Sequence, residues 1–375
     1  MASPALTDIK IPAQLLPLDG RFGSGPSKIR AEQIDAVVRA SRNILGTSHR
    51  QAPVKNLVGS VIDQMRQLFQ LPQDWDVVIG NGGASLFWDA ATFGLIHERS
   101  AHFVFGEFSS KFAQAAQLAP HLGDPIVIES APGTVPAIQQ SDVDTYCLTH
   151  NETSTGASMQ LSRPATPADA LVVVDGTSAA GGIDWSPTEV DVYYFSPQKG
   201  FASEGGTWIA LCSPRAVERI NKIKSNGRWC PPSLDLSLAL ENSRANQTYN
   251  TPSISTFVML NNQLQWMLEN GGLAWCTERT AQSSQYLYDW ATRQSFAAPF
   301  VHNPAYRSPV VGTIDIDGIE ASTINAVLRE NGIVDTDSYR KLGRNQLRMS
   351  MFPSVEPTDI QQLTKCIDYI VEQLS

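Results

Sequence analysis

A lysine stands between two apolar segments, where lysine is uncommon. In DVYYFSPQKGFASEGGTWIALC, residues 191–212, Lys199 follows one strand-like run and precedes another. Burial lowers the pKa of a lysine amine, which then becomes a base or a nucleophile. Asp175 also ends an apolar run, in ALVVVDGTSAAGG, residues 170–182. If the two runs are neighbouring strands, both side chains face one crevice. Two structural alternatives remain. Asp175 and Lys199 could form only a salt bridge, or Asp175 could be the N-cap of the next helix.

A lysine and an aspartate in one pocket are also what pyridoxal 5′-phosphate (PLP) needs. The amine forms a Schiff base with the aldehyde, and the carboxylate keeps the pyridine nitrogen protonated, so that the ring accepts electrons. The phosphate needs an anchor, and VVIGNGGASLFWDAATF, residues 77–93, predicts a strand, a glycine-rich turn and a helix start. The N–H groups of Gly83, Ala84 and Ser85 can hold a phosphate there, helped by the helix dipole. Phe108 can stack on the ring, although an aromatic residue after a strand more often belongs to the core.

The elements around these residues indicate an α/β fold. From about residue 70, short apolar runs such as WDVVIG, AHFVFG, TYCLTH and TWIALC alternate with helical stretches such as ASLFWDAATFGL. Runs that are apolar throughout are typical of strands buried on both faces, which predicts a mainly parallel central sheet. After about residue 270 the pattern predicts a smaller α+β domain. We therefore expect a segment 1–25 that packs with this small domain, a large domain 26–270 and the small domain 271–375.

Composition excludes several classes of protein. The 375 residues carry a formal net charge of −9 without a basic stripe, which argues against nucleic-acid binding. No apolar run has the length of a membrane span, and the N-terminus lacks the pattern of a signal peptide. The five scattered cysteines form no CxxC pair, which favours a reducing cytoplasm and no metal site. Neither GxGxxG nor GxxxxGKS occurs, which weakens a dinucleotide or P-loop interpretation.

Five motifs, spread over most of the chain, resemble those of the phosphoserine aminotransferase family. They are TSHR, HNETSTG, VVVDGTSAAGG, FSPQKGF and YNTP, and the resemblance runs from about residue 20 to the C-terminus. It implies a PLP-dependent aminotransferase of fold type I, class V, which is a cytoplasmic homodimer with active sites at the subunit interface. It also implies ping-pong interconversion of 3-phosphohydroxypyruvate and L-glutamate with O-phospho-L-serine and 2-oxoglutarate, in serine biosynthesis. Some members also act in pyridoxine synthesis.

The resemblance assigns roles in the cofactor site. Lys199 matches the Schiff-base lysine and Asp175 the partner of the pyridine nitrogen. Thr153 matches the residue that binds the phenolic oxygen, and Phe108 falls where most members stack a tryptophan. The remaining matches surround the cofactor phosphate. In the same chain they are Gly83, Ala84 and Gln198, with Ser85 beside the first two. Asn250 and Thr251 match residues that reach the phosphate from the other subunit.

The resemblance also assigns residues that bind the two anionic ends of the substrate. Arg348 matches the arginine that binds the α-carboxylate, although the strand pattern of NQLRMSMF is also that of a solvent-facing residue. His49, Arg50 and Arg340 match the pocket for the distal phosphate.

The chain departs from the family in three places. Ala84 replaces an arginine, Tyr339 replaces a histidine, and the loop before Arg348 is about two residues longer. The longer loop adds Lys341 and Arg344, which we expect to restore the lost positive charge.

Two other interpretations remain. Another fold-type I PLP enzyme, such as an alanine–glyoxylate-type aminotransferase or a cysteine desulfurase, shares the same lysine and aspartate. A desulfurase needs a mobile cysteine, and neither Cys212 nor Cys366 has the sequence context of an exposed nucleophile. A binding protein that has kept only the fold would have no need of Lys199.

Overall fold

The computed structural model describes residues 9–165 and 169–374 and contains a seven-stranded sheet. Its strand order is β1-β9-β8-β7-β4-β2-β3. The bounds are β1 (Asp76–Asn81), β9 (Thr207–Cys212), β8 (Val192–Phe195), β7 (Leu171–Asp175), β4 (Thr145–Thr149), β2 (Ser100–Val104) and β3 (Ile126–Glu129). Every neighbouring pair is parallel except the two that involve β9. The predicted mainly parallel sheet is confirmed.

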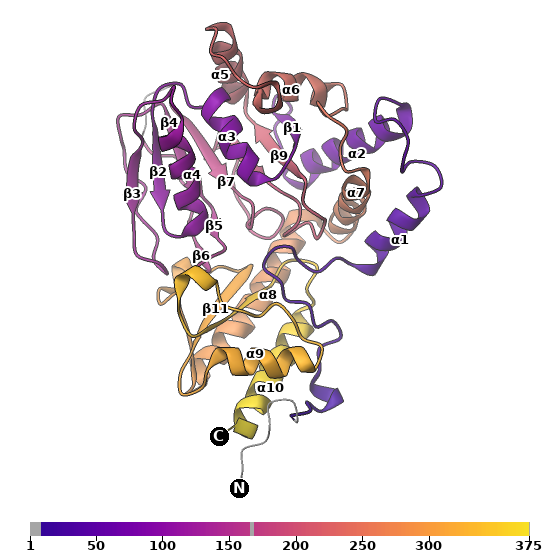
Figure 1. The fold of residues 1–375 in the computed structure, drawn as a ribbon, viewed down its shortest axis with the longest axis vertical. Coiled ribbons are helices and arrows are strands. Elements are labelled where there is room, and N and C mark those ends of the chain that lie inside the picture. The colour runs from indigo at the N-terminus through magenta and orange to yellow at the C-terminus, as the bar shows by residue number, and fades with distance from the viewer. Residues whose placement is uncertain (1–8, 166–168, 375) are drawn as a thin grey trace.

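Helices cover both faces of this sheet, which explains its uniformly apolar strands (Figure 1). In β7, Val172 and Val174 belong to one core, whereas Leu171 and Val173 belong to another, because successive side chains of a strand point to opposite faces. The helices that contribute most to the first core are α2 (Ala52–Leu68) and α7 (Ile254–Glu269), and α1 (Ala31–Ala40) packs beside α7. The second core contains residues of α3 (Ala84–Gly94), α4 (Glu107–Leu118), α5 (Pro214–Ser225) and α6 (Leu236–Arg244).

A separate core lies below the large sheet in Figure 1. It is built on the antiparallel strands β10 (Ala297–Pro299), β11 (Val311–Ile316) and β12 (Gln346–Ser350), with α9 (Ala321–Glu330) and α10 (Pro357–Leu374). Three residues from the start of the described chain, Ile9, Ile11 and Phe22, are buried in it. Helix α8 (Gly272–Arg293) links the two parts, because Cys276 lies in the first core and Leu287 in this one.

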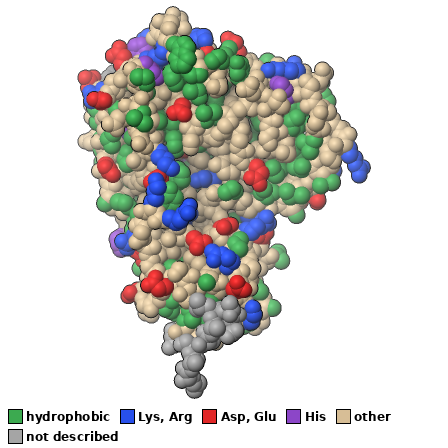
Figure 2. Space-filling view, in the orientation of Figure 1, with side chains coloured by type: hydrophobic (Ala, Val, Ile, Leu, Met, Phe, Trp, Pro, Cys, Tyr) green, Lys and Arg blue, Asp and Glu red, His purple; other side chains and the backbone are tan. Residues whose placement is uncertain are grey.

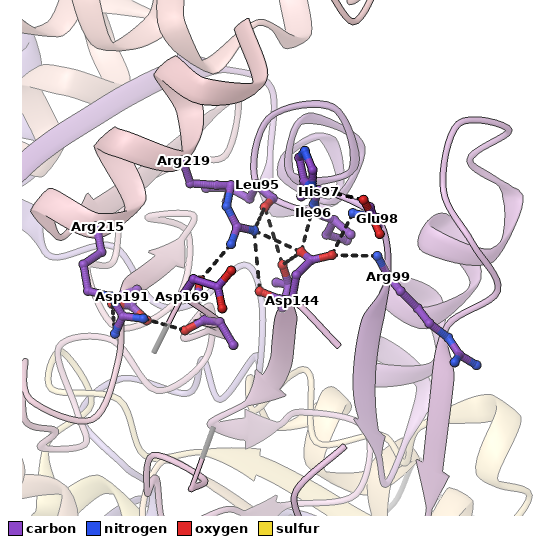
Figure 3. Close-up of polar contacts among 12 residues, drawn as sticks. Leu95, Ile96, His97, Glu98, Arg99, Asp144, Asp169, Asp191, Arg215 and Arg219 are labelled. Atoms are coloured by element: carbon purple, nitrogen blue, oxygen red, sulfur yellow. Dashed lines mark hydrogen bonds and ion pairs between the residues drawn. The ribbon is translucent and has the colours of Figure 1, made fainter. Parts of the chain in front are cut away.

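A polar network fastens the starts of the parallel strands (Figure 3). The Asp144 carboxylate accepts backbone N–H groups of His97, Glu98 and Arg99 at 2.7–2.9 Å. Arg219 donates to the same carboxylate at 3.0 Å and to the Asp169 carbonyl at 2.8 Å. Burial raises the pKa of Asp144, but these hydrogen bonds outweigh it and leave the pKa below its usual range. The network lies at the strand edge opposite to the one where ligands bind, so its role is structural.

Within the described ranges, no helix has the length and apolarity needed to cross a bilayer. Among the same residues, no group of three His, Cys, Asp or Glu side chains is arranged to hold a metal ion.

Candidate active site

Asp175 and Lys199 come together at the carboxyl ends of β7 and β8. The two strands are parallel neighbours, with Asp175 paired to Tyr194, so the expectation that they lie side by side is confirmed. Both residues line a cavity of about 140 Å³. The other residues that line it are Gly83, Ala84, Ser85, Trp88, Phe108, Thr149, Asn151, Thr153, Thr177, Ser178 and Gln198.

Lys199 is buried, with only 7% of its surface exposed. Its Nζ donates a hydrogen bond to Thr153 Oγ1 at 2.8 Å and lies 5.1 Å from the centre of the Phe108 ring. Burial lowers the pKa of the amine to about 8; the charge of Asp175 opposes this shift, and that of Arg348 adds to it. The amine is therefore easy to deprotonate near neutral pH, as a base or nucleophile requires.

Two N–H donors hold the Asp175 carboxylate in place. Oδ1 accepts the backbone N–H of Thr177 at 2.9 Å, and Oδ2 accepts the indole N–H of Trp88 at 3.2 Å. A turn follows Asp175 rather than a helix, so it is not an N-cap. Trp88 was not predicted, although it lies one helical turn after Ala84 and so shares its side of α3.

The phosphate cradle predicted from the glycine-rich turn opens into the cavity. Gly83 is the N-cap of α3, and the first-turn N–H groups of Ala84 and Ser85 have no acceptor inside the helix. Gln198 Oε1 and Asn151 Oδ1 are buried, and neither has a hydrogen-bond partner among the described residues. Buried polar atoms are normally paired, so these groups indicate a polar ligand in the cavity. These two amide oxygens accept hydrogen bonds, whereas the free N–H groups at the start of α3 donate them, and it is these N–H groups that fit the phosphate of a phosphorylated cofactor.

A strap formed by residues 22–27 passes over Lys199. Ser27 Oγ donates to the Lys199 carbonyl at 2.6 Å, and the Ser27 N–H donates to the Gln198 carbonyl at 2.9 Å. A Cβ atom on Gly25 would lie 2.8 Å from Cε of Lys199. This contact was not predicted either; the only sequence signal is the run of small residues GSGPS.

Arg348 reaches the site from the second part of the molecule. It lies on β12, and its Nη1 donates to the Thr153 carbonyl at 3.2 Å. Its guanidinium lies 5.3 Å from the centre of the Tyr339 ring, and its buried Nε has no partner among the described residues. Burial lowers the pKa of this guanidinium. Arg348 is therefore half-buried against the segment that carries Thr153, near enough for its charge to act on the Lys199 amine, with one N–H left to bind an anion.

The two additional basic residues of the longer loop lie in different places. Lys341 forms an ion pair with Glu107 at the start of α4, close to the cavity. Arg344 instead forms a two-pronged ion pair with Asp315 on β11, so the expectation that it supplies charge to the anion pocket is wrong. Arg340 is exposed on the short helix Arg340–Leu342. Lys and Arg side chains gather on this face at the junction of the upper and lower parts (Figure 2).

The other four predicted residues, His49, Arg50, Asn250 and Thr251, form a cluster that does not line the cavity. Thr251 Oγ1 and His49 Nδ1 are 3.1 Å apart, and the Asn250 N–H donates to Asn81 Oδ1 at 3.2 Å. Arg50 donates to Gln247 Oε1 at 2.6 Å. A single chain does not bring this cluster into the cavity, and the expectation that Asn250 and Thr251 serve the partner subunit stays a prediction.

Comparisons with known proteins agree with this geometry. The aminotransferase class-V family model matches residues 22–338. The chain is 54% identical over 366 residues to a phosphoserine aminotransferase of Rhodococcus opacus, covering 97% of this chain and 98% of that one. It is 55% identical over 369 residues to a putative phosphoserine aminotransferase of Mycolicibacterium vanbaalenii, covering 98% and 99%.

The fold is also that of solved aminotransferases. A phosphoserine aminotransferase of Cytophaga hutchinsonii superposes with a TM-score of 0.84 at 22% identity, covering 94% of this chain and 99% of that one. At this identity the likeness shows the fold alone, and it confirms the predicted fold type. The resemblance predicted from the five motifs is confirmed by the relatives, and the chain belongs to the aminotransferase class-V family.

Proposed function

We propose that this chain is a PLP-dependent phosphoserine transaminase. It would interconvert 3-phosphohydroxypyruvate and L-glutamate with O-phospho-L-serine and 2-oxoglutarate. The observation that carries the proposal is the buried Lys199 amine, which lies between Thr153, Phe108 and Asp175 at the carboxyl ends of the strands. The substrate assignment is supported by the relatives of 54–55% identity that carry this name.

The residues of the cavity suit each part of PLP. Lys199 would hold the aldehyde carbon, Asp175 would face the pyridine nitrogen, and Thr153 would bind the phenolic oxygen. Phe108 offers a face for the ring, and Gly83, Ala84, Ser85 and Gln198 offer donors to the phosphate. When bound, PLP supplies an electron-accepting ring that stabilises negative charge at the substrate's α-carbon.

The protein's own side chains position the substrate and move the proton. The Lys199 amine, with a pKa of about 8, takes a proton from the α-carbon and returns it. Arg348 binds the α-carboxylate through the Nε that lacks a protein partner. Trp88 keeps the Asp175 carboxylate fixed, so that the site needs little rearrangement when charge develops.

The distal phosphate requires residues from two chains. We infer a homodimer in which His49, Arg50, Asn250 and Thr251 of one subunit complete the site of the other, together with the exposed Arg340 of the site's own chain. The family resemblance supports this assignment for Asn250 and Thr251, and His49 joins them because its Nδ1 lies 3.1 Å from Thr251 Oγ1. A cytoplasmic location, a second role in pyridoxine synthesis and the domain limits at residues 25 and 270 stay predictions.

The test is a substrate comparison with purified, PLP-loaded protein. O-phospho-L-serine with 2-oxoglutarate should yield glutamate far faster than L-alanine with glyoxylate yields glycine. L-cysteine should release no sulfide, because Cys212 and Cys366 are buried and burial raises the pKa of both thiols. Preference for L-alanine and glyoxylate would overturn the substrate assignment, and sulfide release would overturn the reaction class.

A further inference from the structure

Glu152 carries a fully buried carboxylate that the proposed chemistry does not use. It lies on the short strand β5 (Asn151–Glu152), next to Thr153. Its Oε2 accepts the backbone N–H groups of Phe108 and Ser109 at 3.1 and 2.9 Å, and the Ser109 hydroxyl at 2.9 Å. Its Oε1 accepts the Ser154 hydroxyl at 2.7 Å and the Ser154 N–H at 3.2 Å.

Hydrogen bonds stabilise the buried charge of Glu152 without a neighbouring cation. In the described part of the chain, Glu152 forms no ion pair with a lysine or arginine within 4.0 Å. A lone buried carboxylate is costly, but the free N–H groups and the dipole at the start of a helix stabilise it. The chain also approaches very closely here, since a Cβ on Gly106 would lie 2.3 Å from Cγ of Glu152.

The two segments joined by Glu152 are those that contact the Lys199 amine. One carries the Phe108 ring and the other carries the Thr153 hydroxyl. We propose that Glu152 is a positioning residue, whose carboxylate ties the start of α4 to the segment after β5 and so fixes both contacts around Lys199. Its importance for cofactor binding rests on the function proposed above; its effect on the amine does not.

The charge of Glu152 also acts on the amine. The charged groups facing Lys199 are Asp175 from β7, Arg348 from β12 and Glu152 from β5. Glu152 favours the protonated amine, so its removal should lower the pKa of Lys199 below the present value of about 8. Arg348 also lies near the ring of Tyr339, and burial is the main cause that raises the pKa of the Tyr339 hydroxyl.

The first experiment is amide hydrogen exchange on the apoprotein. Glu152→Gln should speed exchange at Phe108 and Ser109 by about ten- to hundredfold, the range for losing charge-assisted hydrogen bonds. Asp144→Asn is the matched control, because Asp144 also accepts three backbone N–H groups, but at the opposite edge. It should speed exchange at residues 97–99 only. Unchanged protection of Phe108 and Ser109 in Glu152→Gln would overturn the proposal.

The second experiment measures the pKa of the Lys199 amine in the apoprotein, from the pH dependence of its acylation read by mass spectrometry. Glu152→Gln should lower this pKa, whereas Asp144→Asn should leave it unchanged. Glu152→Asp keeps the charge in a shorter side chain and should keep the pKa while it loosens the amides. Affinity for PLP should fall in both Glu152 variants. If Glu152→Gln and Asp144→Asn have the same pKa of the Lys199 amine and the same affinity for PLP, Glu152 is merely structural. Neither apoprotein measurement depends on turnover, so a failure of the proposed function would be seen separately.

Discussion

Replacing Gly25 with alanine should disturb Lys199 directly. Gly25 has a φ of +138°, which L-residues rarely adopt, and the new Cβ would lie 2.8 Å from Cε of Lys199. Ordinary contacts of this kind measure 3.4–4 Å. The lysine must move by several tenths of an ångström, and its 2.8 Å hydrogen bond to Thr153 then lengthens or bends.

The cost has two parts that can be separated. The backbone conformation costs about 1–3 kcal/mol for a residue with a Cβ. Overpacking against the lysine costs about 1–3 kcal/mol more. Only the second part involves Lys199, because an alanine at position 199 has no Cε atom to meet. Gly227, with a φ of +82° and no atom of the described residues within 4 Å of its Cβ position, is a control for a positive φ without a side-chain clash.

The assay is a double-mutant cycle on the apoprotein, followed by urea unfolding. Gly25→Ala should lower the unfolding free energy by about 1–3 kcal/mol more in wild type than in Lys199→Ala. Gly227→Ala should cost the same in both backgrounds. Equal costs of Gly25→Ala in the two backgrounds would refute the contact, because the whole effect would then be backbone strain.

Three further changes have distinct signatures. The pKa of Lys199 is about 8 in the folded apoprotein and 10.5 for an ordinary lysine, so between these pH values the unfolded chain binds more protons at this group than the folded one, and its contribution to stability should rise with pH there by on the order of 3 kcal/mol. The buried cysteine thiols with a raised pKa act in the opposite direction, so the measured quantity is the difference in unfolding free energy between wild type and Lys199→Met in urea at several pH values; this difference should change with pH in favour of wild type, and a difference that stays constant would exclude Lys199 as a source. Trp88→Phe removes one donor to Asp175 and should weaken PLP binding about tenfold by fluorescence titration, as expected for a hydrogen bond to a charged group; unchanged affinity would show that Thr177 alone suffices. Arg348→Ala should slow both half-reactions in stopped-flow measurements, since both substrates carry an α-carboxylate, whereas Arg344→Ala should slow neither; an effect on one half-reaction only would reassign Arg348.

Much of the fold could be predicted from local patterns. Strands such as β7 are apolar throughout because helices cover both faces, and this pattern is visible in the sequence alone. The meeting of Asp175 and Lys199 followed from one assumption, that consecutive parallel strands lie side by side. Asp175 and Lys199 could therefore be placed together without knowledge of any long-range contact, whereas Thr153 and Gln198 were assigned only through the family resemblance.

The rest depends on contacts between distant segments. Gly25 meets Lys199, and Glu152 meets the start of α4, through approaches that no local pattern encodes. Arg344 does not supply charge to the anion pocket because its Nη2 pairs with Oδ2 of Asp315, on a neighbouring strand, at 2.8 Å. In the proposed homodimer the cluster around His49 would complete a site on a second chain, which the sequence of one chain does not show.

Helix α8 has a consequence for how the length of this chain can change. It is buried in one core at Cys276 and in the other at Leu287, and a Cβ on Gly312 of β11 would lie 2.2 Å from Leu287. One inserted residue between these points would turn the far end by about 100° and shift it by about 1.5 Å. Both buried faces could not be kept, so insertions and deletions should be excluded from the middle of α8. Relatives of different length should instead vary in surface loops, which tolerate such changes.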